Sequence, residues 1–192
     1  TEGEPIIMRR AKAFEHILDN IPIIIRDGEL IAGSATIRPR SCQVFPEFSF
    51  EWLEAEFDTV AERSADPFYI SEETKKTLHE VYKYWKGKTS SDLATSYMSP
   101  ETLTAMKHNM FTPGNYFYNG IGHVTVDYGK VITYGYSEYI KEIEEELAGM
   151  RVSDANYCKK HALLEAMLIS LRAVIRYAKR YSRLAKEMAE KE

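Results

Sequence analysis

The sequence predicts a mainly α-helical protein with a small amount of β-structure. Most of its 192 residues lie in runs whose apolar side chains recur every three or four positions, the spacing of an amphipathic helix. Only residues 23–36 and 124–128 have the β-branched, alternating character of short strands. The chain is long enough for one domain with a hydrophobic core, and its 44% hydrophobic and 28% charged content is typical of a globular protein.

The first helix is expected over residues 4–20, where Pro5 suits the first helical position. Its apolar side is formed by Ile7, Ala11, Phe14, Ile17 and Leu18. Residues 23–25 and 29–36 follow as two short strands on either side of Asp27-Gly28, which is a tight-turn signal. We therefore expect a small hairpin or strand pair packed on this helix.

Three helices are expected in the middle of the chain, each from a start signal. Ser49 is expected to cap a helix that runs to about Arg63, and Ser71 opens the next, which Gly87 ends. Ser99-Pro100-Glu101 combines a cap, a proline and an acid, and is the clearest start signal. The residues expected to face inward are Phe50, Trp52, Leu53, Phe57 and Val60 in the first helix, and Leu78, Val81, Tyr82 and Trp85 in the second.

The C-terminal part predicts a helix over residues 136–150, stopped by Gly149, and then one very long helix or two in line over residues 153–190. The acidic run in 142–146 and the basic stripe in 172–186 are best explained as solvated helix faces. No repeat, low-complexity segment or linker is visible, so a single mostly helical unit is expected. The last helix remains amphipathic to its end, and its apolar stripe needs a surface to pack on.

The charge and cysteine content exclude several classes of protein. A net charge of −4 gives no reason to expect nucleic acid or an anionic membrane as a partner. The longest apolar run, residues 21–25, is too short to span a bilayer, and no signal peptide is visible. Cys42 and Cys158 lie far apart, which excludes a disulfide framework and a metal site built from cysteine motifs. We expect a cytoplasmic protein without a metal.

The most suggestive stretch for function is residues 111–128, which is rich in glycine and aromatic residues. It predicts a loop that leads into a short strand at 124–128, and His123 stands at the junction. His123 is either a structural histidine satisfied by backbone groups or a group that orients substrate or donates a proton. Asp127 has the same side-chain parity in a strand, and we interpret it as a turn or surface acid.

Several motifs give the chain a resemblance to a known family. Gly122-His123-Val124-Thr125-Val126-Asp127-Tyr128 matches the GH-x-x-x-DY signature of glycyl radical enzymes of the pyruvate formate-lyase superfamily. The further matching segments are residues 9–11, 21–23, 25–33, 38–41, 44–48 and 94–98. The sequence is most similar to the coenzyme-B12-independent glycerol and propane-1,2-diol dehydratases.

This resemblance implies a fold and an activity. Residues 1–192 would be the N-terminal helical portion of a pyruvate formate-lyase domain, an α/β barrel whose radical-cysteine barrel and C-terminal glycine-radical domain follow outside this sequence. In such enzymes a radical S-adenosylmethionine (SAM) activating enzyme installs a glycyl radical, which is passed to a cysteine that attacks the substrate. The resemblance also implies a small diol substrate, a glutamate base and a homodimer. His123 would hydrogen-bond the substrate hydroxyls and help protonate the leaving group.

The departures from the family pattern limit what is carried over. Neither Cys42 nor Cys158 stands in the Cys-Val-Glu motif of the radical cysteine, and the Arg-Val-x-Gly-Tyr motif of the radical glycine is absent. His123 is therefore the only catalytic and substrate-binding residue assigned, no cofactor is expected to bind this chain, and the chain alone is expected to be inactive. Two alternatives remain: a glycyl radical lyase that cleaves C–N or C–C bonds (choline lyase, decarboxylase or formate acetyltransferase type), and a non-catalytic helical fragment or interaction module.

Overall fold

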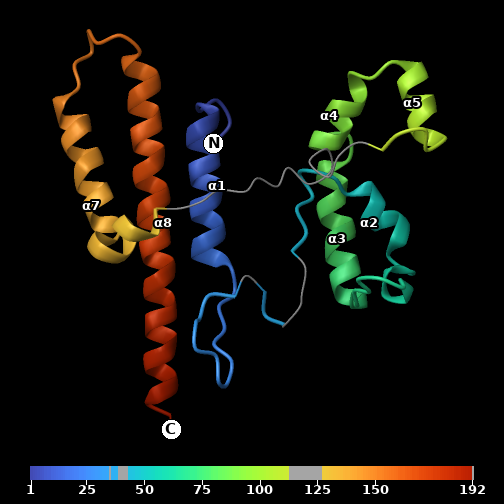
Figure 1. The fold of residues 1–192 in the computed structure, drawn as a ribbon, viewed down its shortest axis with the longest axis horizontal. Helices are drawn as coiled ribbons and strands as arrows, with labels where there is room; N and C mark the ends of the chain where they lie inside the picture. The colour runs from blue at the N-terminus through green and yellow to red at the C-terminus, as the bar shows by residue number, and fades with distance from the viewer. Residues whose placement is uncertain (35, 39–42, 113–126, 192) are drawn as a thin grey trace. The chain divides into compact units, whose positions relative to one another are not determined.

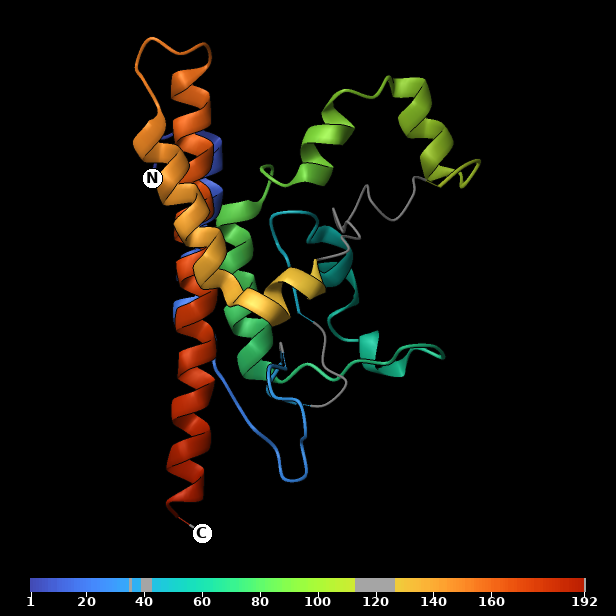
Figure 2. The same cartoon turned by 60° about the vertical axis from the view of Figure 1, so that its left-hand side comes forward.

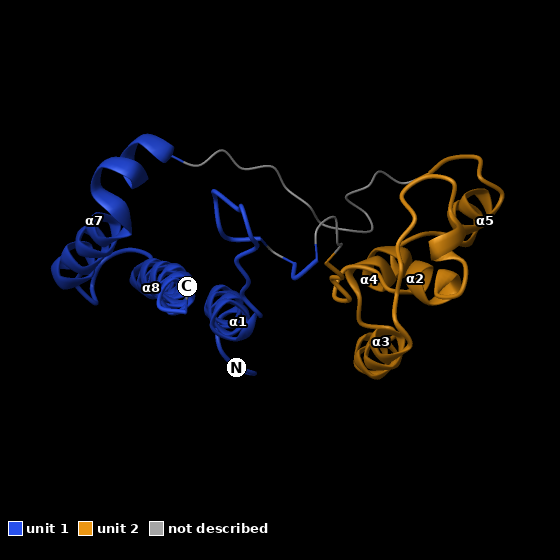
Figure 3. Cartoon of the chain, turned by 90° about the horizontal axis from the view of Figure 1, so that it is seen from below, with its two compact units in different colours: residues 1–39, 126–192 blue, residues 40–125 orange. Residues whose placement is uncertain are grey.

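The computed structural model of the chain describes residues 1–34, 36–38, 43–112 and 127–191 (Figure 1). It divides into two compact units, where the sequence suggested one: unit 1 is residues 1–39 and 126–192, and unit 2 is residues 40–125 (Figure 3). The regular elements of the described residues are all helices. Among them, none combines the length and the apolar character that crossing a membrane requires.

Unit 1 is built on its last helix, α8 (Tyr157–Ala189), with α1 (Ile6–Asn20) and α7 (Tyr128–Gly149) packed on it. Figures 1 and 3 show α8 between the other two. The long C-terminal helix is continuous over 33 residues, so of the two predicted forms the single helix is correct. Small residues lie where the helices meet, since Ala11, Ala166 and Ala173 are all buried. The stripe of α8 is thus packed largely within the unit.

The C-terminal end of α1 is bound by a side chain of α8. The last four carbonyl groups of a helix have no partner within that helix. The Arg180 guanidinium donates to the carbonyl oxygens of Leu18 and, at 2.7 Å, of Ile21, while the Ile21 backbone N–H donates to Ile17 O at 2.7 Å. The positive charge of Arg180 also lies at the negative end of the α1 dipole. Arg180 therefore acts as a C-cap supplied from another helix.

Arg176, one turn earlier on α8, binds two carboxylates of α1. It donates to Asp19 Oδ1 at 3.0 Å and to Glu15 Oε1 at 2.7 Å. The hydrogen bond from Arg176 holds the pKa of the Asp19 carboxyl below its ordinary value of 3.8, against a smaller opposing effect of desolvation. The prediction that the basic stripe is a solvated helix face is thus wrong for Arg176 and Arg180, because both are used to hold α1.

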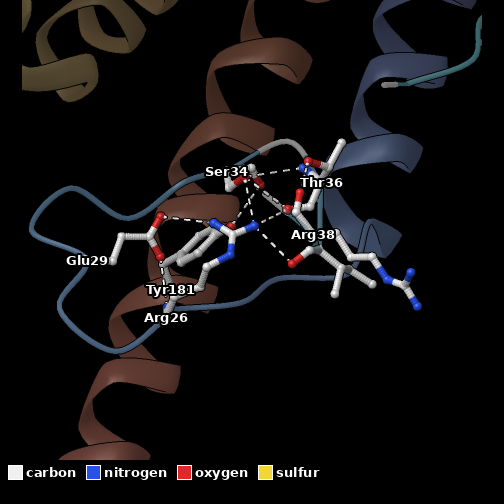
Figure 4. Close-up of polar contacts among 7 residues, drawn as sticks. Arg26, Glu29, Ser34, Thr36, Arg38 and Tyr181 are labelled. Atoms are coloured by element: carbon white, nitrogen blue, oxygen red, sulfur yellow. Dashed lines mark hydrogen bonds and ion pairs between the residues drawn. The ribbon is translucent and has the colours of Figure 1, made fainter. Parts of the chain in front are cut away.

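The strands expected at 23–25 and 29–36 are absent from the described residues of that segment, and a side chain organises it instead (Figure 4). Arg26 Nη2 donates to the carbonyl oxygens of Thr36 and Ile37, both at 2.9 Å. The turn at Asp27-Gly28 does form, with Gly28 at φ +73° and Glu29 N donating to Arg26 O at 3.0 Å. A strand is stable only beside another strand. In this segment the Arg26 guanidinium binds the carbonyl groups of Thr36 and Ile37, which in a strand pair would accept hydrogen bonds from the neighbouring strand.

Unit 2 is a small helical cluster around stacked aromatic rings. Its elements are α2 (Glu51–Glu56), the 3₁₀ turn η1 (Val60–Glu62), α3 (Glu72–Trp85), α4 (Ser90–Ser96) and α5 (Pro100–Lys107). The rings of Phe50 and Tyr82 stack with centroids 4.4 Å apart, and Phe57 meets Phe50 edge-on at 6.1 Å. Leu53 completes the buried cluster, with Ile70 and Leu78 packed against it.

The helix starts of unit 2 follow local side-chain chemistry. Ser71 and Ser99 accept hydrogen bonds from Thr74 N and Thr102 N, as their start signals predicted. The sequence analysis missed α4, which opens with a reciprocal capping box between Thr89 and Asp92.

The predicted helix over 49–63 is wrong in extent. Phe50, which carries no capping side chain, precedes α2, so the expected Ser49 cap is not made, and the helix ends at Glu56 before η1. The inward positions of Phe50, Leu53, Phe57 and Val60 are confirmed. Trp52 remains 43% exposed, with Arg63 over its ring, because the short helix leaves it on the outer side.

Replacing Arg180 with alanine should loosen α1 from α8. The loss of two charged hydrogen bonds to helix-end carbonyls, which water can partly replace, predicts a decrease of about 1–2 kcal/mol in the free energy of unfolding. The matched control is Arg183→Ala, which removes an exposed arginine of the same helix. Urea denaturation followed by circular dichroism measures both. Equal effects of the two substitutions would contradict the capping role.

The ion pair of Asp19 predicts a pH dependence of stability. Because its pKa is lowered in the folded state, its stabilising contribution is present above its unfolded pKa and is lost as the pH falls through the folded value. The urea midpoints of the wild type and of Asp19→Asn should therefore differ at pH 7 and converge below about pH 4. A difference that is constant between pH 7 and pH 3 would exclude this ion pair as its cause.

Candidate functional site

The predicted catalytic residue, His123, lies in residues 113–126 and so outside the described residues. Residues 108–112, which follow α5, precede this stretch, and Asp127 at the start of α7 follows it directly. Among the described residues, the element next to His123 in the sequence is therefore α7.

Asp127 caps α7. Its Oδ1 accepts a hydrogen bond from Lys130 N at 3.1 Å, which satisfies one of the free N–H groups at the helix start. Of the two interpretations, a turn or a surface acid, the second is confirmed, because Asp127 is exposed; its structural role is that of a helix cap. The strand expected at 124–128 is wrong for its last two residues, because Tyr128 is the first residue of the helix; residues 124–126 lie outside the described residues.

A glycine bends α7 shortly after its start. Gly135 has φ +70° and ψ −179°, a conformation that is essentially restricted to glycine. In a straight helix, residues 130 and 142 would be about 18 Å apart along the axis. The bend instead lets Lys130 Nζ reach Glu142 Oε2 at 2.7 Å (Figure 2, where the first part of α7 turns away from the rest). Gly135 therefore sets the direction of the first part of α7 relative to the rest of the helix.

The contact between Lys130 and Glu142 fixes this bend. The hydrogen bond that the Lys130 ammonium donates to the Glu142 carboxylate raises the pKa of Lys130 above its ordinary value, against a smaller effect of desolvation. The same ammonium lies 4.2 Å from the centroid of the Tyr139 ring, on the far side of Gly135. The sequence analysis missed this arrangement, although a glycine inside an otherwise helical pattern was a visible signal.

The other chemical candidates form no site among the described residues. The acidic face of α7 is engaged in ion pairs, Glu142 with Lys130, Glu144 with Arg172 and Glu146 with Lys160. Within the described ranges, no group of three or more histidine, cysteine, aspartate or glutamate side chains is placed to hold a metal ion. Cys158 is exposed, and Cys42 lies outside the described residues.

Gly135→Ala should straighten or strain α7. A Cβ at this backbone conformation costs on the order of 1–3 kcal/mol in the free energy of unfolding. Gly129→Ala is the matched control, since Gly129 is in the same helix, its added Cβ would be at an ordinary 3.5 Å from Asp127 Oδ1, and alanine favours helix. Urea unfolding should show a loss for position 135 and no loss for position 129. Equal stability of the two variants would show that the bend does not depend on glycine.

Comparison with known proteins identifies the family of this chain. A model of the family described as pyruvate formate lyase-like matches residues 1–192. The sequence is 34% identical to (2S)-3-sulfopropanediol dehydratase from Klebsiella oxytoca over all of this chain and 24% of that protein.

Two solved structures are also similar over the whole chain. One, described for 1,2-propanediol dehydration in Roseburia inulinivorans, is 64% identical with a TM-score of 0.91, and this chain covers 23% of it. The other, the glycerol-bound B12-independent glycerol dehydratase from Clostridium butyricum, is 53% identical with a TM-score of 0.91, and 24% of it is covered. This chain spans about a quarter of the length of these relatives. The chain belongs to the pyruvate formate lyase-like family.

Proposed function

We propose that this chain is part of a glycyl radical lyase, a B12-independent diol dehydratase that acts on propane-1,2-diol or glycerol. The observation that carries the proposal is the 64% identity to the Roseburia inulinivorans protein over the whole chain. The identity to the sulfopropanediol dehydratase is 34%, which favours a diol without a sulfonate group.

The proposed reaction breaks one C–O bond. Propane-1,2-diol loses its C2 hydroxyl as water and gives propanal, and glycerol gives 3-hydroxypropanal and water. A glycyl radical, installed by a radical SAM activating enzyme, supplies the hydrogen-atom abstraction in the complete enzyme. Within this chain, His123 would donate a hydrogen bond to the substrate hydroxyl and a proton to the departing oxygen.

The structure of α7, which follows His123 in the sequence, supports the proposal of this role. The segment that carries His123 ends at the Asp127 cap, and the Gly135 bend and the Lys130–Glu142 pair set the direction of the helix that follows. His123 precedes this cap by four residues in the sequence, and a proton donor acts efficiently only when the backbone that carries it is well positioned. We further propose that the complete enzyme is a cytoplasmic homodimer and that this chain alone has no activity.

A chimera tests the proposed activity. This chain replaces the matched quarter of the Roseburia inulinivorans protein, and the product is activated anaerobically with the activating enzyme. Propanal from propane-1,2-diol, or 3-hydroxypropanal from glycerol, is the expected product. Trimethylamine from choline, without either aldehyde, would favour the C–N lyase alternative. No product from any substrate, with a normal radical signal, would favour the non-catalytic alternative.

In the same chimera, His123→Ala should decrease kcat by about 10²–10⁴-fold, the usual contribution of a general acid. The glycyl radical signal in electron paramagnetic resonance should keep its size, because His123 is not proposed to carry the radical. His123→Gln keeps a hydrogen-bond donor without a transferable proton, so KM should change less than kcat.

His108→Ala is the control, since His108 is exposed after the end of α5. Near-normal turnover in His123→Ala, with a normal radical signal, would exclude the role.

A further inference from the structure

An open apolar groove of about 600 Å³ runs over α8 between α1 and α7. Ile7 and Phe14 line it from α1, Val131 and Tyr139 from α7, and Leu163 and Met167 from α8. Figures 1 and 3 show α8 between the other two helices. The groove lies entirely within unit 1.

The groove is lined by large apolar side chains that remain accessible to water. Phe14, Leu163 and Met167 are each about 40% exposed, at 41%, 44% and 40%. Two more large apolar side chains on the same helices, outside the lining of the groove, are exposed as well: Ile17 on α1 and Ile132 on α7, at 53% and 81%. Exposed apolar side chains gathered on one set of helices often mark an interaction site.

The extent of this surface favours a polypeptide over a small ligand. A small molecule of the groove's volume would leave Ile17 and Ile132 in water. In the relatives with a TM-score of 0.91, the same fold is only 23–24% of the chain, so three quarters of each polypeptide is available to cover it. An amphipathic helix fits a groove between two helices, because packed helix axes are about 8–10 Å apart.

Two charged residues line the groove, and Asp127 is already used as the cap of α7, so Arg10 is the one that specifies the occupant further. Arg10 lines the groove, is exposed, and has no hydrogen bond or ion pair with any residue that the structure describes. An arginine at the edge of an apolar interface is best satisfied by a carboxylate, which it binds with two parallel hydrogen bonds.

We propose that this groove is the docking surface for an amphipathic segment of the remaining polypeptide of the complete enzyme, with a carboxylate opposite Arg10. This inference rests on the proposed function in one respect, that the chain works as part of a longer lyase. Its occupant is a segment of the same enzyme and neither a second copy of this chain nor a small apolar molecule.

Thiol accessibility tests the docking. Cys42 and Cys158 are replaced by serine, and Met167→Cys is compared with the control Lys179→Cys, an exposed position on the same helix. Alkylation is followed by peptide mass spectrometry in the 192-residue chain and in the chimera with the Roseburia inulinivorans protein. The thiol of Met167→Cys should react at least about tenfold more slowly in the chimera, as expected when docking of the segment is favourable by 1.4 kcal/mol or more. The thiol of Lys179→Cys should react equally in both.

Two further variants make the result specific. Arg10→Glu should restore alkylation at position 167 in the chimera, whereas Arg10→Lys, which keeps the charge, should restore much less. If cysteine at 167 disturbs the packing, Leu163→Cys, one turn earlier in the groove, gives the same comparison.

The outcomes separate this inference from the proposed function. Equal reactivity of position 167 in the free chain and in the chimera would overturn the docking, whether or not the diol is dehydrated. Protection already in the 192-residue chain, with a dimer in light scattering, would overturn it in favour of a second copy. Protection in a chimera that fails to dehydrate any diol would support the docking and count against the proposed function alone.

Discussion

The binding of the C-terminal end of α1 by two arginines of α8 is the interaction on which unit 1 depends. A helix of 15 residues leaves its last carbonyls free, and these must be hydrogen-bonded where the end packs against protein. Arg180 supplies the donors and Arg176 neutralises the acids beside them. The residues that these hydrogen bonds join are 157–162 positions apart in the sequence, so the contact connects the two segments of unit 1 that the sequence of unit 2 separates.

Polar contacts of this kind supplement a thin apolar core in unit 1. The buried side chains where its helices meet include several alanines, which allow close approach but bury little apolar surface. Ion pairs connect α7 to α8 at its edges, through Glu144–Arg172 and Glu146–Lys160. Exposed pairs contribute little each. Together, these ion pairs fix how α7 lies on α8. Larger apolar residues of both helices line the groove between α1 and α7.

The bend at Gly135 connects this scaffold with the proposed chemistry. The helix after the bend packs on α8, while the first part, which begins at the Asp127 cap, has a different direction. The Lys130–Glu142 pair joins the two parts across the bend. In the sequence, the segment that contains His123 is followed directly by this first part of α7, whose direction depends on one glycine, so Gly135 bears on the proposed role of His123.

The sequence by itself determined the elements whose cause is local. The starts of α3 and α5 follow from Ser71 and Ser99-Pro100, and the helical character of α8 from its periodicity, because caps and helix patterns act within a few residues; that α8 is one helix and not two was left open by the sequence. The resemblance carried by residues 122–128 and the other motifs led to the family for the same reason, since a motif is a local pattern. Thr89 and Asp92 show that a local signal can be missed even when it is present.

Tertiary contacts decided the rest. Residues 23–34 have strand-like composition, but in the described structure Arg26 binds the carbonyls of Thr36 and Ile37, so no strand pair forms. The basic stripe of α8 has the composition of a solvated face, yet Arg176 and Arg180 bind α1. Whether a carbonyl or a carboxylate is bound by water or by a distant arginine depends on which segments meet in space. That information is in the packing of the helices and in no short stretch of the sequence.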